Sequence, residues 1–453
     1  MKVLIANTDC RLGGVGTFML SLRAALRAAG HHAELFYLQH GPLEAQLAGD
    51  PHVHFGSLTD LLRLVDREAF DIVHANNIDW ASGMSAVPRI GARLVLTAHK
   101  LRAPAWTYGW TTRDCQAFVA VSRWVRDGLQ PYTDIPIQVV PNGIDVHRFS
   151  PGPAAPNGSG PIVAWVGRGG SRVKRLEFFA QLAPALRRAG CRIWVVDQHP
   201  PTALAEDFPD AAQLLHEHAD RWGGVDHLEM PRLYREIAAS GGCVISTSSQ
   251  EGLGLALLEA QSCGCPVIGP DVNGVNESVS PEHGGLLFPS DASPDAAAAL
   301  VIETLRDRDA LQRRGAAAAA HVRNTFSLEC MARSYLQIYG RRDFGRVGTL
   351  RSRMRARRRL TPVFHTPEYL EHRWGVGDRQ LEVARELARS RDWRLAAAAA
   401  RASIRAAPTL YLKPGRLLTL VGLELRARTA PRTRRTPPDS GVAEDRRASV
   451  LRF

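Results

Sequence analysis

Residues 250–264 combine two carboxylates with a glycine-rich turn. The sequence is QEGLGLALLEAQSCG, in which Glu251 precedes Gly252 and Gly254, and Glu259 lies in an apolar stretch that predicts a helix. Glycine lets a backbone approach an anion closely, and the free N–H groups at the start of a helix point toward that anion. Ionised carboxylates accept hydrogen bonds from hydroxyl groups. The segment therefore predicts a site for a ligand that carries both phosphates and hydroxyls, such as a nucleotide sugar.

The residues before this motif predict a strand that ends at the site. Residues 243–248, CVISTS, form a short β-branched run typical of a buried parallel strand. In open α/β sheets, ligands bind outside the carboxyl ends of the strands. At a rise of about 1.5 Å per residue, the helix displaces Glu259 from Glu251 by several ångströms. One carboxylate is therefore expected to bind a sugar and the other a ribose.

The two glutamates, together with the GCPVI sequence at 264–268, resemble the signature of the retaining glycosyltransferases of the GT-B fold, glycosyltransferase family 4. Further blocks follow in the order that this family has: GGVG at 13–16, DIVHA at 71–75, LTAH at 96–99, VAVS at 119–122, VPNGID at 140–145, VGR at 166–168 and GGLLFP at 284–289. The resemblance covers about residues 1–340. So many blocks in one order are a more specific signal than a lone glycine turn.

The resemblance implies roles for particular residues. Glu251 would hold the hydroxyls of the transferred sugar, Glu259 would bind the ribose, and His99 would face the donor sugar. Cleavage of the bond to phosphate leaves a diphosphate, whose charge Arg168 and Lys174 are expected to stabilise in place of a divalent metal. These expectations give a catalytic set of Glu251, His99, Arg168 and Lys174, and a donor-binding set of Gly14, Gly16, Arg168, Lys174, Glu251, Gly252, Leu253, Gly254, Leu255 and Glu259. No metal or other cofactor is expected.

Several assignments have structural alternatives. The interval from Arg168 to Lys174 is one residue longer than the family's usual spacing, so Arg172 and Arg175 compete with Lys174. His99 also fits the role of a capping or core histidine. The glycines at 13–16 are compatible with simple turn geometry, as are Asn142, Gly143 and Asp145 with an ordinary loop, and His74 is interpreted as structural or acceptor-side.

Two series of alternating strands and helices must position these residues. The first has strands at 2–6, 33–38, 71–75, 93–98, 117–122 and 137–140, with helices at 15–29 and 58–67. The second has strands at 162–166, 193–197, 243–248 and 266–269, with a helix at 174–189. The pattern predicts an α/β fold with two doubly wound parallel sheets, which the GT-B resemblance arranges as two facing Rossmann-like domains.

The domain prediction follows from composition and from the family. We expect an acceptor-side domain at 1–150, a Pro- and Gly-rich linker at 151–161, a nucleotide-sugar-binding domain at 162–325, a helix crossing back to the first domain at 326–340, a basic and alanine-rich helical extension at 341–430, and a disordered tail at 431–453. Beyond residue 340 the family pattern stops.

Composition and charge bound the setting of the protein. The chain is 45% hydrophobic and 23% charged, lacks an apolar run of about 18 residues, and begins directly with a predicted strand, so a cytoplasmic protein is expected. Its seven scattered cysteines predict reduced core thiols. Residues 1–340 carry a net charge of −4 and residues 341–453 carry +16, which together give the net charge of +12. All of the positive excess therefore lies in the extension.

The arginine-rich segment 341–360 predicts attachment to the inner face of the plasma membrane. Each basic residue near an anionic bilayer contributes about 1 kcal/mol, which would hold the enzyme peripherally without a spanning segment. A solvated arginine-rich helix is the alternative. Nucleic-acid binding is disfavoured, because the segment has neither interleaved aromatics nor a recognisable module.

The predicted activity is transfer of a hexose-type sugar from a UDP- or GDP-sugar to a glycan, lipid-linked or other hydroxyl acceptor, with retention of configuration, in envelope or exopolysaccharide synthesis. The sequence DQHPP at 197–201 departs from the family's glycine-rich turn near the base, so the choice between uridine and guanosine stays open. Aromatic residues in the loop 101–113 are candidates for acceptor contact. The alternatives are a nucleotide-sugar epimerase of the same architecture and a catalytically silent GT-B-like binding protein.

Overall fold

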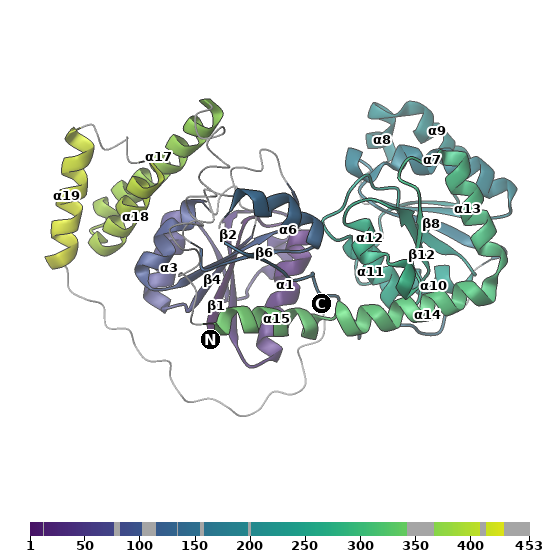
Figure 1. The fold of residues 1–453 in the computed structure, drawn as a ribbon, viewed down its shortest axis with the longest axis horizontal. Coiled ribbons are helices and arrows are strands. Elements are labelled where there is room, and N and C mark those ends of the chain that lie inside the picture. The colour runs from purple at the N-terminus through teal and green to yellow at the C-terminus, as the bar shows by residue number, and fades with distance from the viewer. Residues whose placement is uncertain are drawn as a thin grey trace.

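The computed structural model describes residues 1–11, 13–76, 82–101, 115–133, 135–154, 158–197, 201–341, 367–407 and 414–429. Within these ranges the chain forms two α/β lobes and a helical extension. The extension, the first lobe and the second lobe lie in that order along the long axis of the molecule (Figure 1).

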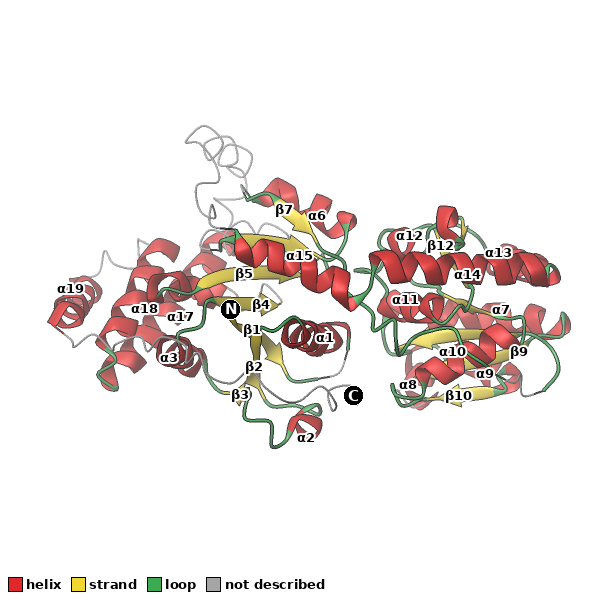
Figure 2. Ribbon diagram, turned by 90° about the horizontal axis from the view of Figure 1, so that it is seen from below, coloured by secondary structure: helices red, strands yellow, loops and turns green. Residues whose placement is uncertain are grey.

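The first lobe is built on a seven-stranded parallel sheet with the order β3-β2-β1-β4-β5-β6-β7. Its strands are β1 (Lys2–Asp9), β2 (His32–Gln39), β3 (Val53–Phe55), β4 (Ile72–Asn76), β5 (Arg93–Ala98), β6 (Ala117–Ala120) and β7 (Ile137–Val139). Its helices are α1 (Gly14–Ala28), α2 (Glu44–Leu47), α3 (Leu58–Glu68), η1 (Ser82–Ile90), α6 (Arg123–Leu129) and η3 (Gln130–Tyr132). Continuous apolar runs such as 3–6 are fully buried, as expected for strands covered on both faces (Figure 2).

The second lobe contains a six-stranded parallel sheet with the order β10-β9-β8-β11-β12-β13. Its strands are β8 (Ile162–Gly167), β9 (Arg192–Asp197), β10 (Arg221–Gly223), β11 (Cys243–Ile245), β12 (Val267–Pro270) and β13 (Leu286–Phe288). Its helices are η4 (Arg172–Lys174), α7 (Leu176–Arg188), α8 (Pro201–Asp207), α9 (Pro209–His218), α10 (Met230–Ala239), α11 (Leu255–Ser262), α12 (Val275–Ser278), η5 (Pro281–His283), α13 (Pro294–Arg306) and α14 (Arg308–Thr325). The two parallel sheets confirm the predicted fold class.

The chain passes between the lobes twice, and the two passages touch. After α14, helix α15 (Leu328–Gly340) runs back along the first lobe (Figure 1). At the passage, Ile144 N donates to Phe326 O at 2.6 Å, and Leu328 N donates to Ile144 O at 3.1 Å. The apolar face of α15 joins the core beside α1 through residues Met331, Tyr335, Ile338 and Tyr339. The helix is therefore an integral part of the first lobe.

The extension consists of α17 (Pro367–Arg389), α18 (Trp393–Ala406) and α19 (Pro414–Thr429), which pack on one another and against α3 and η1 of the first lobe. Thr59 donates to Glu386 at 2.8 Å, and Arg63 Nε donates to Asp392 at 2.8 Å. These three helices lie within the region predicted as a basic and alanine-rich helical extension, and most of its alanines are in α18. Among the helices that the structure describes, none is both long and apolar enough to cross a bilayer. The segment 342–360 and the tail 431–453 lie outside the described residues.

Some predicted elements differ from those observed, for physical reasons. The helix predicted from residue 174 begins at Leu176, because Arg175 adopts a left-handed conformation (φ 49°) and leaves Lys174 in a 3₁₀ turn. Strand β11 ends at Ile245 rather than at 248. The sequence pattern does not predict β3, β10 or β13, which are three-residue edge strands whose side chains are for the most part only partly buried. The seven cysteines are all free, as predicted.

Candidate functional site

Glu251 lies in the loop between β11 and α11, where its carboxylate is surrounded by donors. Glu251 Oε1 accepts hydrogen bonds from Lys174 Nζ and from Ser248 Oγ, the latter at 2.8 Å. The Glu251 N–H donates to Asn273 O at 3.0 Å. A Cβ on Gly274, which has φ 80°, would lie 1.8 Å from Glu251 O. Asn273 and Gly274 thus support the backbone of Glu251, a role that the motif at 250–264 does not reveal.

Lys174 is the cation that the structure places against Glu251. Its turn is held by the Thr247 hydroxyl, which lies 2.8 Å from Lys174 O, and the Lys174 side chain is 22% exposed. The two competing arginines point elsewhere, because Arg172 lies 3.9 Å from Asp207 and is 81% exposed, and Arg175 stacks over the Phe178 ring at 4.6 Å. Of the three candidates, only Lys174 contacts the carboxylate.

Arg168 stands in the turn directly after β8, with its side chain exposed. The next residue, Gly169, donates its N–H to the buried Asp197 carboxylate at 2.8 Å, and this bond fixes the turn. Among the residues that the structure describes, no side chain forms a hydrogen bond or ion pair with the Arg168 guanidinium. Arg168 therefore retains its donors for an anion at the carboxyl end of β8.

Glu259 lies in the middle of α11 and is 6% exposed. Its oxygens face His227, whose Nε2 lies 3.1 Å from Oε1, and Tyr234, whose hydroxyl lies 3.5 Å from Oε2. Gly254 directly precedes the helix and has a φ of 77°, in the left-handed region that favours glycine. His227 and Tyr234 are more than twenty residues away in the sequence and belong to no recognised motif, so sequence reasoning misses them.

His99 follows the last residue of β5 and is partly buried. Asn76 donates through Nδ2 to Ala6 O at 3.2 Å, which turns its Oδ1 toward His99 Nε2 at 2.9 Å. Since that oxygen can only accept, Nε2 carries the proton and Nδ1 is an acceptor. His99 Nδ1 is buried and has no hydrogen-bond partner among the described residues. Burial lowers the pKa of His99 to about 3, so the ring is neutral.

The two lobes meet at these residues. A Cβ on Gly252 would lie 2.2 Å from the His99 carbonyl oxygen, so only glycine permits this approach. A Cβ on Gly14 would lie 3.9 Å from Leu255, an ordinary contact across the same junction. Gly16 instead permits a close turn within the first lobe, because its Cβ would lie 2.2 Å from Arg11 O. The junction therefore brings the glycine-rich loop after β1 beside the predicted donor motif.

A carboxylate that sequence reasoning misses also links the lobes. Glu277 of α12 accepts hydrogen bonds from Arg123 N at 2.8 Å and from Trp124 N at 2.7 Å, in the first turn of α6. A helix start has free N–H groups and a positive dipole end, so it favours a negative charge. Glu277 lies outside the sequence blocks that identify the family, so the sequence pattern does not single it out.

Other predicted residues lie apart from this junction. His74 is fully buried and bonds to Tyr339 at 2.6 Å and Thr97 at 2.7 Å, which ties β4 to α15. Leu253 is buried, in keeping with a packing role. The Gly143 N–H contacts Met331 Sδ at 3.1 Å, so the loop after β7 supports the passage between the lobes. The aromatic loop at 102–113 lies outside the described residues.

Comparison with known proteins identifies the family. The profile of Glycosyltransferase Family 4 matches residues 12–148, and that of Glycosyl transferases group 1 matches residues 160–307. Alpha-maltose-1-phosphate synthase of Mycolicibacterium smegmatis is 28% identical over 320 residues, which cover 62% of this chain and 81% of that protein. The lipopolysaccharide core biosynthesis mannosyltransferase LpsB of Rhizobium meliloti is 26% identical over 361 residues, which cover 75% of this chain and 97% of LpsB.

Solved structures share the fold. HepE of Anabaena, in complex with UDP and glucose, superposes with a TM-score of 0.62 at 18% identity, over 75% of this chain and 99% of HepE. A glycosyltransferase from Rickettsia africae superposes with a TM-score of 0.63 at 19% identity, over 75% and 97%. Both lobes are matched by family profiles, and the fold is that of GT-B enzymes. The chain belongs to the GT-B glycosyltransferases of glycosyltransferase family 4.

Proposed function

We propose that this glycosyltransferase moves a hexose-type sugar from a UDP- or GDP-sugar to a hydroxyl of a glycan or lipid-linked acceptor, with retention of anomeric configuration. The observation that carries the proposal is the contact of Lys174 with Glu251, beside the point where Gly252 touches His99. A cation for the leaving phosphate and a carboxylate for the sugar hydroxyls are thereby adjacent. HepE, solved with UDP-glucose, and LpsB, named a mannosyltransferase, support a nucleotide-sugar donor.

The leaving group is the first task of such a site. As the bond between the anomeric carbon and the β-phosphate oxygen breaks, its electron pair stays on that oxygen, and negative charge grows there. Arg168 would meet this charge with its free guanidinium fork. An ammonium group has three donors, so Lys174 can retain Glu251 and still donate to a phosphate oxygen. This arrangement assigns charge stabilisation to the protein's own cations and requires no divalent metal.

The ribose and the sugar need hydroxyl-binding groups at different depths. Glu259 offers two acceptor oxygens, one of which contacts the partly exposed side chain of His227. The hydroxyls of a ribose would either replace His227 at this carboxylate or bind beside it. His99 Nδ1 is an unpaired acceptor that a hydroxyl of the transferred sugar would satisfy, since a buried acceptor without a partner is unfavourable. Glu251, which lies on the second lobe, would accept a hydrogen bond from another hydroxyl of the same sugar.

A donor screen tests the proposal directly. The purified protein is incubated with UDP-, GDP- and ADP-sugars, and release of the nucleoside diphosphate is measured with and without EDTA. We expect one donor class to give turnover that survives EDTA. NMR of the product then determines the anomeric configuration, with retention expected. Conversion of the donor sugar without an acceptor would instead identify an epimerase, and failure to bind any nucleotide would favour a silent binding protein.

We also propose that the extension holds the enzyme against an anionic membrane, where an envelope-type acceptor would be met. Helix α19 exposes three apolar side chains, Leu418 (71%), Val421 (49%) and Leu425 (59%), which fall on one side of the helix. Residues three apart are neighbours on a helix surface, so Val421 lies beside Glu424 and Leu425 beside Arg428. Glu424 and Arg428 line a cavity that we call the basic hollow, so the apolar side chains border it.

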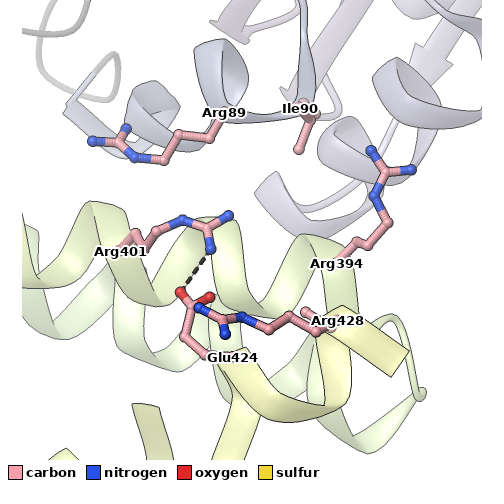
Figure 3. A pocket seen from close by; sticks show the side chains of 7 residues that line it. Arg89, Ile90, Arg394, Arg401, Glu424 and Arg428 are labelled. Atoms are coloured by element: carbon pink, nitrogen blue, oxygen red, sulfur yellow. Dashed lines mark hydrogen bonds and ion pairs between the residues drawn. The ribbon is translucent and has the colours of Figure 1, made fainter. Parts of the chain in front are cut away.

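The basic hollow is a cavity of about 440 Å³ between η1 and the extension, lined by Arg89, Ile90, Arg394, Arg401, Glu424, Ala427 and Arg428. Figure 3 shows Arg89 and Ile90 reaching in from the first lobe, opposite the side chains of the extension. The lining holds four arginines and a single carboxylate, Glu424, which pairs with Arg401 at 2.6 Å, while Arg394 lies 3.9 Å from Asp66 outside the lining. Apolar side chains beside an excess of arginine suit an interface with anionic phospholipid.

Liposome sedimentation tests the membrane proposal. Binding to vesicles with anionic lipid is expected to fall at high salt, because screening weakens the attraction. The double variant L418S/L425S is expected to bind several-fold more weakly, whereas Leu228→Ser, a change at an exposed leucine of the second lobe, serves as the matched control. Equal binding of the two variants would contradict a role for α19.

A further inference from the structure

Three histidines surround one buried carboxylate at the edge of the first sheet. Glu34 is 5% exposed, and its Oε1 lies 2.5 Å from His32 Nε2 and 3.7 Å from His52 Nδ1. Its other oxygen, Oε2, lies 2.6 Å from His54 Nε2. The ligand atoms of His32, Glu34 and His52 all lie within 4.8 Å of one another. The rings of His32 and His52 meet edge to face at 5.1 Å.

The strand register explains why these side chains converge. β2 begins with the sequence His-Ala-Glu at 32–34, and His52 directly precedes β3, which contains His54. Side chains two residues apart in a strand point to the same face, and β3 runs parallel to β2 with Phe36 opposite His54. His32, Glu34 and Phe36 therefore point to the same face of the sheet as His52 and His54. They lie in or directly before its edge strand β3 and in the neighbouring strand β2.

We propose that His32, Glu34 and His52 form a binding site for a divalent transition metal of the zinc type. Imidazole nitrogens and a carboxylate are ligands that Zn²⁺ prefers, and a tetrahedral ion with bonds of about 2.1 Å separates its ligands by about 3.4 Å. The observed separations bracket that value, so small side-chain rotations complete the site. At His32 the ion would take the place of the proton between Nε2 and Glu34 Oε1, and that proton would move to Nδ1 or to solvent.

The surroundings fit such a site. The side chains of His32 and His52 are 43% and 42% exposed, which gives an ion an entry path. His54, bonded to the second oxygen of Glu34, orients the carboxylate from behind, as outer-shell partners of metal ligands do. Lys2 Nζ lies 3.8 Å from Glu34 but 3.0 Å from Glu68, so its charge has a nearer carboxylate partner than the site.

The metal site is separate from the proposed transfer site. His32 is the first residue of β2, whereas Gly14 and His99 follow the carboxyl ends of β1 and β5. An eight-residue strand is about 25 Å long, so the two sites lie at opposite ends of the parallel strands. The ion would join edge strand β3, which has only three residues, to its neighbour. Its expected effect is on stability rather than on sugar transfer.

Metal titration of the full chain tests the inference. The protein is treated with EDTA, the chelator is removed, and Zn²⁺ stoichiometry is measured by equilibrium dialysis, with Co²⁺ absorption as a second readout. We expect one tight site per chain and a rise in Tm with Zn²⁺. His52→Ala and Glu34→Gln are expected to weaken binding more than tenfold, and His54→Ala about 10- to 100-fold through orientation of Glu34.

His40→Ala is the matched control, because His40 also pairs with a glutamate, Glu44 at 2.8 Å, outside the cluster. It is expected to leave the tight site unchanged. X-ray absorption of the zinc-loaded wild type needs no variant and is expected to show nitrogen and oxygen ligands only. Sulfur ligation, absence of a tight site, or unchanged binding in folded cluster variants would overturn the inference. Sugar transfer that persists after EDTA leaves the proposed function independent of this outcome.

Discussion

Gly252 brings the backbone of the second lobe against that of the first. Any side chain there would meet the His99 carbonyl oxygen at 2.2 Å, and a backbone atom cannot move aside as a flexible side chain can. The residue lies between Glu251 and the start of α11. Its lack of a side chain therefore sets the distance between groups that we assign to one reaction.

Replacing Gly252 by alanine should uncouple the lobes at the site. A displacement of about 1 Å in a reacting group can cost about 100-fold in rate, and we expect kcat to fall by that order. Gly223→Ala is the control, since a Cβ there meets nothing within 4 Å. Steady-state kinetics with the identified donor provide the measurement. Equal activity of the two variants would show that the contact has no part in transfer.

Lys174 and Arg172 form a natural pair for separating charge at the site from charge near it. Lys174→Ala removes the cation beside Glu251, and we expect kcat to fall about 10²- to 10³-fold because the leaving phosphate loses a fixed donor. Arg172→Ala should leave kcat within about twofold, since that side chain is 81% exposed and points to Asp207. Comparable losses in both variants would contradict the assignment.

At the scale of elements, the start of helix α6 and the carboxylate of Glu277 form a contact between the lobes. Two backbone N–H groups of α6 donate to this one side chain, while Ser122 caps Val125 N from within the first lobe. The helix is thus capped from both lobes, and its free donors are satisfied only when the lobes are together.

Glu277→Ala is expected to weaken this association by about 1–3 kcal/mol, because hydrogen bonds to a charged group are lost. We expect a higher KM for the donor and a larger radius of gyration in solution scattering, with a nearly unchanged circular dichroism spectrum. Glu282→Ala, at an exposed glutamate of the same lobe, is the control. A variant as compact and active as the control would rule out the proposed role.

The same scale shows what a sequence can predict here. Most buried strands were predictable because a run such as 94–98 is continuously apolar or β-branched. The position of Glu251 and Glu259 after strand β11 was predictable because both residues follow that strand closely in the chain. His227, Glu277 and the cluster around Glu34 were not, because they come together only through tertiary packing. The choice of Lys174 over Arg172 and Arg175 depends on one left-handed residue, which no local pattern reveals.

At the scale of the whole molecule, His74 joins β4 to the helix that returns from the second lobe. It is fully buried between Tyr339 and Thr97, and burial together with nearby His99 lowers its pKa to about 3, against an ordinary value of 6.5. The His74 ring is therefore neutral in the folded protein, and protonation of this ring favours the unfolded chain.

This linkage predicts an acid-sensitive fold. The stabilising contribution of neutral His74 is complete above pH 6.5 and decreases as the pH falls toward 3, by about 1.4 kcal/mol per pH unit. Tm is expected to drop between pH 7 and pH 5. His74→Gln, which cannot be protonated in this range, should start from a lower Tm and show a shallower decline. Parallel curves for the two proteins would indicate that other groups control the acid response.

The contact between the two passages, at Ile144 and Phe326, limits how the two lobes can move apart. In Figure 1, helices α14 and α15 run along one side of both lobes, and α6 meets α12 on the other. The backbone therefore joins the two lobes on the side of α14 and α15, where the chain crosses between them twice. We expect any separation of the lobes to begin at the contact of α6 with α12, because the backbone itself holds the lobes together at Ile144 and Phe326.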